Sequence, residues 1–143
     1  MARTRVLLVE DSVQWREFVR HLLCEESVID IVGEISDGLK AVRVAEQLQP
    51  DIILLDIGLP GLNGIEACGW IRRVAPEARV VFLTHLCDGH IAQAAMNRGA
   101  WGCVLKSEAT QDLVPAIRSV SAGLRFVSNR LAVADDVDPE QCP

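Results

Sequence analysis

The sequence predicts a three-layer α/β domain, in which five parallel strands form a doubly wound sheet between two layers of helices. Five short runs rich in branched aliphatic residues alternate with longer stretches of helical periodicity, and short loops join them. The run Ile52–Leu55 has four consecutive aliphatic residues, which suits a strand that is buried on both faces. Because crossovers between parallel strands are right-handed, the helices should cover both faces of the sheet.

The expected elements begin with a strand at Arg5–Val9. Ser12 is a suitable N-cap for the next helix, whose apolar side chains recur every three or four residues. Asp37 and Gly38 then close the second strand, and Pro50 ends the second helix. Further strands are predicted at Val28–Ile35, Asp51–Asp56, Arg79–Leu83 and Trp101–Leu105, and further helices at Leu39–Leu48, from Asn63 or Gly64 to the residue before Pro76, at Asp88–Arg98 and at Gln111–Ala122.

The composition argues against several classes of protein. With 143 residues, 50% of them hydrophobic, the chain is long enough for one domain with a substantial core. The 14 basic and 20 acidic residues give a net charge of −6, which argues against a chain-wide surface for nucleic acid. The apolar runs are strand-sized, so neither a membrane span nor a signal peptide is expected. Five scattered cysteines and three histidines argue against a zinc site and suit a reducing cytosol, which predicts a cytoplasmic location.

Polar side chains follow four of the predicted strands at the same edge of the sheet. Glu10 and Asp11 follow the first strand, and Asp56 ends the third. Thr84 follows the fourth strand, and Lys106 follows the fifth. Taken singly, each has an ordinary structural interpretation, such as an acid at a helix N-terminus, an Asx turn or a solvated lysine. Because the carboxyl ends of parallel strands meet at one edge, the residues together predict a functional site.

The chemistry of this set favours phosphoryl transfer. Three neighbouring carboxylates repel one another and need a cation, and Mg²⁺ accepts oxygen ligands while keeping several waters. A carboxylate can attack phosphorus and form an aspartyl phosphate. The ammonium of Lys106 and the hydroxyl of Thr84 would then stabilise the oxygens of the transferred group.

Four segments of the chain resemble the receiver domain of two-component response regulators. They are Leu8–Asp11, Asp51–Gly64, Val80–Thr84 and Gly99–Lys106. The resemblance covers about residues 4–128, and the closing segment Ala122–Ser128 is similar to the end of receivers in the NarL/LuxR-type branch. It implies the CheY-like, flavodoxin-like (βα)5 fold.

The resemblance implies a role for each acidic residue. Asp56 would accept a phosphoryl group from a phosphohistidine of a sensor histidine kinase. Asp11 and Asp56 would bind Mg²⁺, or Mn²⁺ in its place, directly. Glu10 would bind the metal through water, and Gly58 would bind it through its backbone carbonyl.

The resemblance also implies how a signal leaves the site. Thr84 and Lys106 would bind the phosphoryl oxygens, and Thr84 would move inward upon phosphorylation. This population shift would reach the face formed by the fourth helix, the fifth strand and the fifth helix, which could also support a homodimer. Such a protein is a switch and not an enzyme, since it catalyses only its own phosphorylation and slow dephosphorylation.

One position departs from the family pattern. Three residues before Lys106 the family usually has Tyr or Phe, which swings inward with the threonine, whereas this chain has Cys103. We therefore predict that Thr84 and the loop after it carry the switch without an aromatic partner. Trp101 could substitute for that partner, although a packing role is the better interpretation, and His85 is interpreted as a solvent-facing loop residue.

Residues 1–128 are expected to form the receiver domain, and residues 129–143 a polar tail or linker with four acidic residues and two prolines. The NarL/LuxR-type branch normally continues into a helix-turn-helix domain, so DNA would be reached only through an output domain outside this chain. The leading hypothesis is thus the receiver part of a transcriptional regulator. The alternative is a stand-alone receiver that acts through protein partners.

Two other functions fit the same type of sheet less well. A phosphatase with an aspartyl nucleophile typically has a second Asp two residues after the first, where this chain has Gly58. A flavin-binding module would need a first loop that cradles phosphate, whereas Glu10 and Asp11 would repel it.

Overall fold

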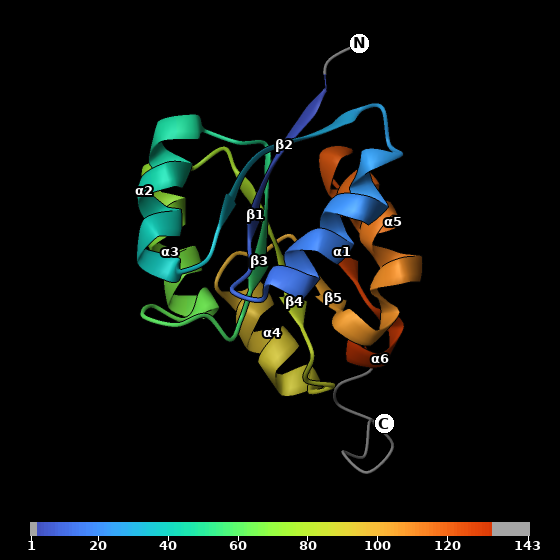
Figure 1. Cartoon of the computed structure of the whole chain (residues 1–143). Helices are drawn as coiled ribbons and strands as arrows, with labels where there is room; N and C mark the ends of the chain where they lie inside the picture. Colours follow the sequence, from blue (N-terminus) through green and yellow to red (C-terminus); the bar gives the residue numbers. More distant parts are fainter. Residues whose placement is uncertain (1–2, 133–143) are drawn as a thin grey trace.

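Six parallel strands form the central sheet of the computed structural model, which describes residues 3–132 (Figure 1). The strands lie in the order β2-β1-β3-β4-β5-β6. Because this order reverses between β1 and β3, the chain winds outward in both directions, and the predicted doubly wound sheet is confirmed. The strands are β1 (Thr4–Val9), β2 (Ile29–Ile35), β3 (Ile52–Asp56), β4 (Arg79–Thr84), β5 (Gly102–Leu105) and β6 (Phe126–Val127).

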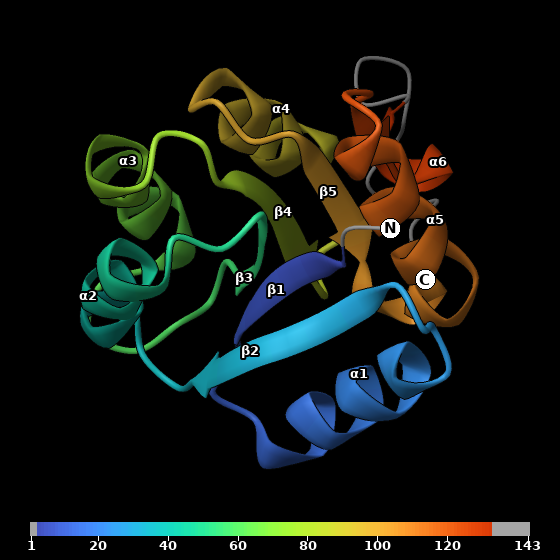
Figure 2. The same ribbon diagram turned by 90° about the horizontal axis from the view of Figure 1, so that it is seen from above.

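Helices cover both faces of the sheet (Figure 2). One layer contains α1 (Val13–Cys24) and α5 (Ala109–Ser121), and the other contains α2 (Gly38–Leu48), α3 (Gly64–Val74) and α4 (Gly89–Asn97). Successive residues of each strand point to opposite layers. In β1, Val6 and Leu8 therefore pack with α1 and α5, whereas Leu7 and Val9 pack with α2 and α3. No helix in the described part of the chain is long and apolar enough to cross a bilayer.

Side-chain caps place the helices close to where the sequence predicts them. Ser12 accepts a hydrogen bond from the backbone N–H of Trp15, as predicted for an N-cap. Asp37, Asn63 and Asp88 cap α2, α3 and α4 in the same way. At the start of α3, a β-carbon on Gly64 would collide with the backbone of Asp56. A glycine at this position therefore lets α3 begin directly against the end of β3.

The C-terminal part of the described chain differs from the prediction. Phe126 and Val127 form β6, a sixth strand that pairs with β5 and is too short to show a periodic pattern. Residues 129–132, which we expected to begin a polar tail, form the helical turn α6 (Asn129–Ala132). The turn forms because Leu131 is only 2% exposed and packs into the core, which holds this segment against the domain. The rest of the predicted tail, 133–143, lies outside the described residues.

Candidate functional site

The predicted site residues lie at the carboxyl ends of the strands, beside the point where the strand order reverses. Glu10 and Asp11 follow β1, and Asp56 is the last residue of the neighbouring β3. Thr84 ends β4, and Lys106 follows β5 at the start of a single 3₁₀ turn, η1 (Lys106–Glu108). Parallel sheets of this type bind ligands at this edge. The sheet therefore places all five residues along one edge, as the sequence predicts.

The three carboxylates form one cluster. One oxygen of each of Glu10, Asp11 and Asp56 lies within 4.8 Å of the others. Glu10 and Asp56 are 1% and 5% exposed, whereas Asp11 faces solvent. Backbone N–H groups orient the two buried acids, because Ser12 donates to Glu10 Oε1 over 3.2 Å and Gly58 donates to Asp56 Oδ1 over 3.1 Å. The cluster thus offers carboxylate oxygens to a cation from its open side.

Lys106 neutralises part of this charge inside the protein. Its Nζ lies 2.9 Å from Glu10 Oε2 and 3.6 Å from Asp56 Oδ2, and its side chain is 6% exposed. The same ammonium lies 4.8 Å from the centre of the Trp15 ring, which places it within range of a cation–π contact. Lys106 therefore bridges the acid after β1 and the acid that ends β3.

Burial opposes ionisation of Glu10. Loss of solvent raises the pKa of its carboxyl above the ordinary value of 4.5, and the hydrogen bond from Lys106 offsets only part of this effect. The charge of Asp56 raises the same pKa further. A cation in the cluster would remove this cost, since it would favour the charged form of every acid around it.

The switch residues of the sequence prediction are also at this edge. Thr84 is 2% exposed, and its hydroxyl accepts a hydrogen bond from the backbone N–H of Leu86 over 3.1 Å. The hydroxyl is therefore held by the loop after β4. His85 is exposed, in agreement with its interpretation as a solvent-facing loop residue.

Cys103 is fully buried on the side of β5 that α4 and α6 cover. Trp101 is half-buried, and the guanidinium groups of Arg79 and Arg125 lie 4.3 and 5.6 Å from the centre of its ring. This environment agrees with a packing role for Trp101. The backbone after Lys106 turns without a cis peptide bond, and none occurs in residues 3–132.

Two contributions to the site were not predicted. The first is Trp15, an apolar residue of α1 whose ring faces the Lys106 ammonium. The second is Arg16, whose guanidinium donates to the backbone carbonyl of Glu10 over 2.7 Å. Both residues lie in the first turn of α1, which begins at Val13, soon after Glu10 and Asp11. A helix that starts so close to the end of β1 keeps the side chains of its first turn near the site, so their positions in the sequence could have suggested these contacts.

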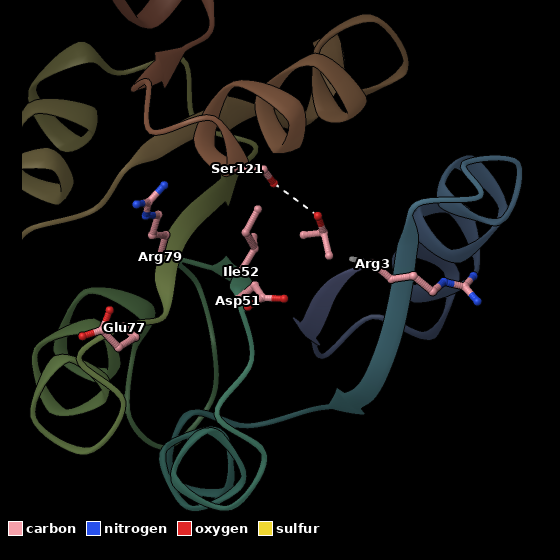
Figure 3. A pocket seen from close by; sticks show the side chains of 7 residues that line it. Arg3, Asp51, Ile52, Glu77, Arg79 and Ser121 are labelled. Atoms are coloured by element: carbon pink, nitrogen blue, oxygen red, sulfur yellow. Dashed lines mark hydrogen bonds between the residues drawn. The ribbon is translucent and has the colours of Figure 1, made fainter. Parts of the chain in front are cut away.

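A polar hollow lies at the other end of the strands, where β1, β3 and β4 begin (Figure 3). Its volume is about 360 Å³, and Asp51, Arg79 and Ser121 are among the residues that line it. Arg79 donates to the Val120 carbonyl over 2.6 Å, and Asp51 accepts the backbone N–H of Arg5. These bonds tie the starts of the strands to each other and to the end of α5. The charges here are therefore engaged in holding the fold.

A doubly wound sheet with an acidic cluster and a buried lysine at its switch point defines the class of receiver domains. The comparison with known families agrees, since residues 6–118 match the response regulator receiver domain. The chain belongs to the response regulator family, and the resemblance found in the sequence is confirmed.

Two curated relatives and one solved structure are of the NarL/LuxR type. The nitrate/nitrite response regulator NarL of Escherichia coli K12 is 34% identical over 126 residues, which cover 88% of this chain and 58% of NarL. The response regulator UvrY of the same organism is 33% identical over 139 residues, which cover 95% of this chain and 64% of UvrY. A crystal structure of a LuxR-family two-component response regulator from Aurantimonas sp. SI85-9A1 has a TM-score of 0.87 and 35% identity, covering 92% of this chain and 94% of that one.

The response regulator domain of Thermotoga maritima CheB shares the same fold. It has a TM-score of 0.79 and 31% identity, and the match covers 84% of this chain and 97% of that one. By contrast, this chain spans only about three fifths of the length of NarL and UvrY, 58% and 64%.

Proposed function

We propose that this chain is a phosphorylation-controlled switch, in which Asp56 accepts a phosphoryl group from the phosphohistidine of a sensor histidine kinase. The observation that supports this most strongly is the cluster of Glu10, Asp11 and Asp56 beside the Lys106 ammonium. Asp56 is 5% exposed, and its Oδ1 is held by the N–H of Gly58. Its second oxygen, Oδ2, faces Lys106 and the acidic cluster, so it is the natural position for an incoming phosphoryl group.

The acidic cluster fits a hard divalent cation, Mg²⁺ or Mn²⁺. Carboxylate oxygens within 4.8 Å of one another suit the oxygen ligands that such ions prefer. Asp11 and Asp56 would bind the ion directly, Glu10 through a water molecule, and Gly58 through its backbone carbonyl. When bound, the ion would offset the negative charge of the cluster and of the transferred phosphoryl group.

The protein's own residues then perform the transfer. A carboxylate oxygen of Asp56 forms a bond to phosphorus while the phosphorus–nitrogen bond of the phosphohistidine breaks, and the electron pair stays on the imidazole. Lys106 leaves Glu10 to pair with a phosphoryl oxygen. Thr84 loses the hydrogen bond from the N–H of Leu86, and its hydroxyl turns to donate a hydrogen bond to a second phosphoryl oxygen. Each of these exchanges makes the phosphorylated form favour a different arrangement of β4 and β5.

The exchange at Thr84 and Lys106 would reach α4, β5 and α5, because α4 follows Thr84 in the chain and Lys106 lies between β5 and α5. This face would pass the signal to a partner, including a second copy of the chain. Because the relatives NarL and UvrY are longer, the second part of the proposal is that the chain is the receiver of a cytoplasmic transcriptional regulator. DNA would then be bound only by an output domain, and a receiver that acts through protein partners alone is the alternative.

Phosphorylation by a small-molecule donor tests the proposal. The chain is incubated with acetyl phosphate and Mg²⁺, with and without EDTA, and its intact mass is measured. We expect a gain of one phosphate that is stable in acid and labile in alkali, requires the metal, and is lost in Asp56→Asn. Asp30→Asn, an exposed residue of β2, is the matched control and should be phosphorylated normally. Continuous release of phosphate would instead indicate a phosphatase, and no gain in mass would refute the proposal.

A further inference from the structure

The end of the described chain is attached to β5, the strand directly before Lys106. β6 pairs in parallel with β5, where Phe126 donates its N–H to the carbonyl of Trp101 over 3.1 Å. Two residues later, Ser128 donates its N–H to the carbonyl of Cys103 over 3.0 Å. The chain after α5 thus returns to the edge of the sheet and runs beside β5 toward the site.

The hydroxyl of Ser128 makes a second and tighter link. Ser128 is fully buried, and its Oγ accepts the backbone N–H of Leu105 over 3.0 Å. The same Oγ donates to the carboxylate of Asp112 in α5 over 2.8 Å. Leu105 is the residue directly before Lys106, so this hydroxyl holds the backbone at the point where the site lysine begins. Because this buried hydroxyl is hydrogen-bonded both to β5 and to α5, it has little freedom to move independently of β5.

The turn α6 follows at once and contacts the parts that phosphorylation would move. Leu131 donates its N–H to the Ser128 carbonyl over 2.8 Å, and its side chain packs into the core cluster that includes Cys103. Arg130 lies 3.3 Å from Glu108, in the 3₁₀ turn that begins with Lys106. α6 also packs against α4 and β5. The segment 126–132 therefore touches β5, α4 and the turn after the site lysine.

We propose that Ser128 is a positioning residue that couples the phosphorylation site to α6. When Lys106 leaves Glu10 for the phosphoryl group, the backbone of Leu105 and the turn after it shift. The Ser128 hydroxyl and the Arg130–Glu108 pair carry that shift into α6. Leu131 packs in the same core cluster as Cys103, the position at which the family usually has an aromatic residue. In this chain Leu131 is the side chain that moves in place of that aromatic residue. This inference rests on the proposed function, since it needs a change of state at Asp56.

Amide hydrogen exchange of the whole 143-residue chain tests the coupling. Exchange is measured by mass spectrometry with Mg²⁺ alone and with Mg²⁺ and beryllofluoride, a phosphoryl mimic. We expect exchange in peptides covering 126–132 to change by about fivefold or more, the lower end of typical coupling between linked sites. In Ser128→Ala this response should disappear, while acetyl phosphate still adds one phosphate to Asp56. Ser121→Ala is the matched control, because Ser121 is exposed at the end of the sheet opposite the site, where the strands begin. This substitution should leave the response unchanged.

The outcomes separate the two proposals. If the protein accepts phosphate but residues 126–132 do not respond, or if Ser128→Ala responds as the wild type does, the coupling is wrong and the proposed function stands. If the protein accepts no phosphate, both fail. Should Ser128→Ala not fold, Asp112→Ala removes the acceptor of the same hydroxyl without altering the buried residue, and it should reduce the response. An undiminished response in Asp112→Ala would then refute the coupling.

Discussion

Replacing Lys106 with methionine is the most direct test of the electrostatics of the site. Methionine keeps an unbranched apolar stem but removes the ammonium that bridges Glu10 and Asp56 over 2.9 and 3.6 Å. The side chains of the two acids are only 1% and 7% exposed, so water cannot replace the lost partner. Removing one member of a buried ion pair costs about 3–5 kcal/mol, because it leaves an uncompensated charge. That loss is a large part of the roughly 5–15 kcal/mol by which a domain is stable.

Urea unfolding at pH 7 without divalent metal measures this loss. The chain has one other lysine, Lys40, which is exposed, and Lys40→Met should change the free energy of unfolding by less than about 0.5 kcal/mol. Adding Glu10→Gln to Lys106→Met should recover part of the loss, because one of the two uncompensated charges is removed. Mg²⁺ should stabilise Lys106→Met more than the wild type, since the metal would be the remaining cation in the cluster.

Two results would refute the reasoning about Lys106. One is a Lys106→Met protein within about 1 kcal/mol of the wild type, well below the cost of an uncompensated buried charge. The other is a double variant with Glu10→Gln that is no more stable than Lys106→Met alone. Either would mean that the carboxylates do not depend on the ammonium.

Three further predictions use the same unfolding assay. The folded protein keeps the proton of Glu10 above pH 4.5, where the unfolded chain releases it. Without metal, the wild type should therefore lose stability relative to Glu10→Gln as the pH rises from 4.5 through the raised pKa. A difference in free energy of unfolding between the two proteins that does not change with pH would contradict this. Trp15→Leu should cost about 0.5–2 kcal/mol more with Lys106 present than in Lys106→Met, because only the former has a cation facing the ring. Cys103→Tyr should cost about 1–3 kcal/mol by overpacking the buried site, and an unchanged stability would show that the site has spare room.

The sequence predicts the sheet and the site edge well, because both depend on local patterns. Runs such as Ile52–Leu55 are apolar on both faces, and their polar end residues fall at one edge of any parallel sheet. The convergence of Asp56 and Lys106 follows from topology alone, although fifty residues separate them in the chain. Their partners could not be predicted to atomic detail, since the choice of Glu10 over Asp11 as the closest acid to Lys106 depends on backbone geometry after β1.

The C-terminal segment shows why the remaining features escaped prediction. Phe126 and Val127 are too few to reveal a strand, and β6 exists because β5 offers it a free edge. Asn129–Ala132 forms one helical turn, which is too short to be stable in isolation. It is held by the burial of Leu131 against residues distant in sequence. Features that depend on tertiary contacts of this kind leave no periodic signal.

The two-residue strand β6 also determines where this domain can be cut. It protects the outer edge of β5, whose residues Gly102–Leu105 are all buried and carry no charge. At the other edge of the sheet, acidic residues such as Asp30 discourage association with a neighbouring molecule. A chain trimmed at residue 118, where the family match ends, would lose the end of α5 and all of β6. The bare, uncharged edge would be a template for aggregation, so a shortened protein should retain the chain through Ala132.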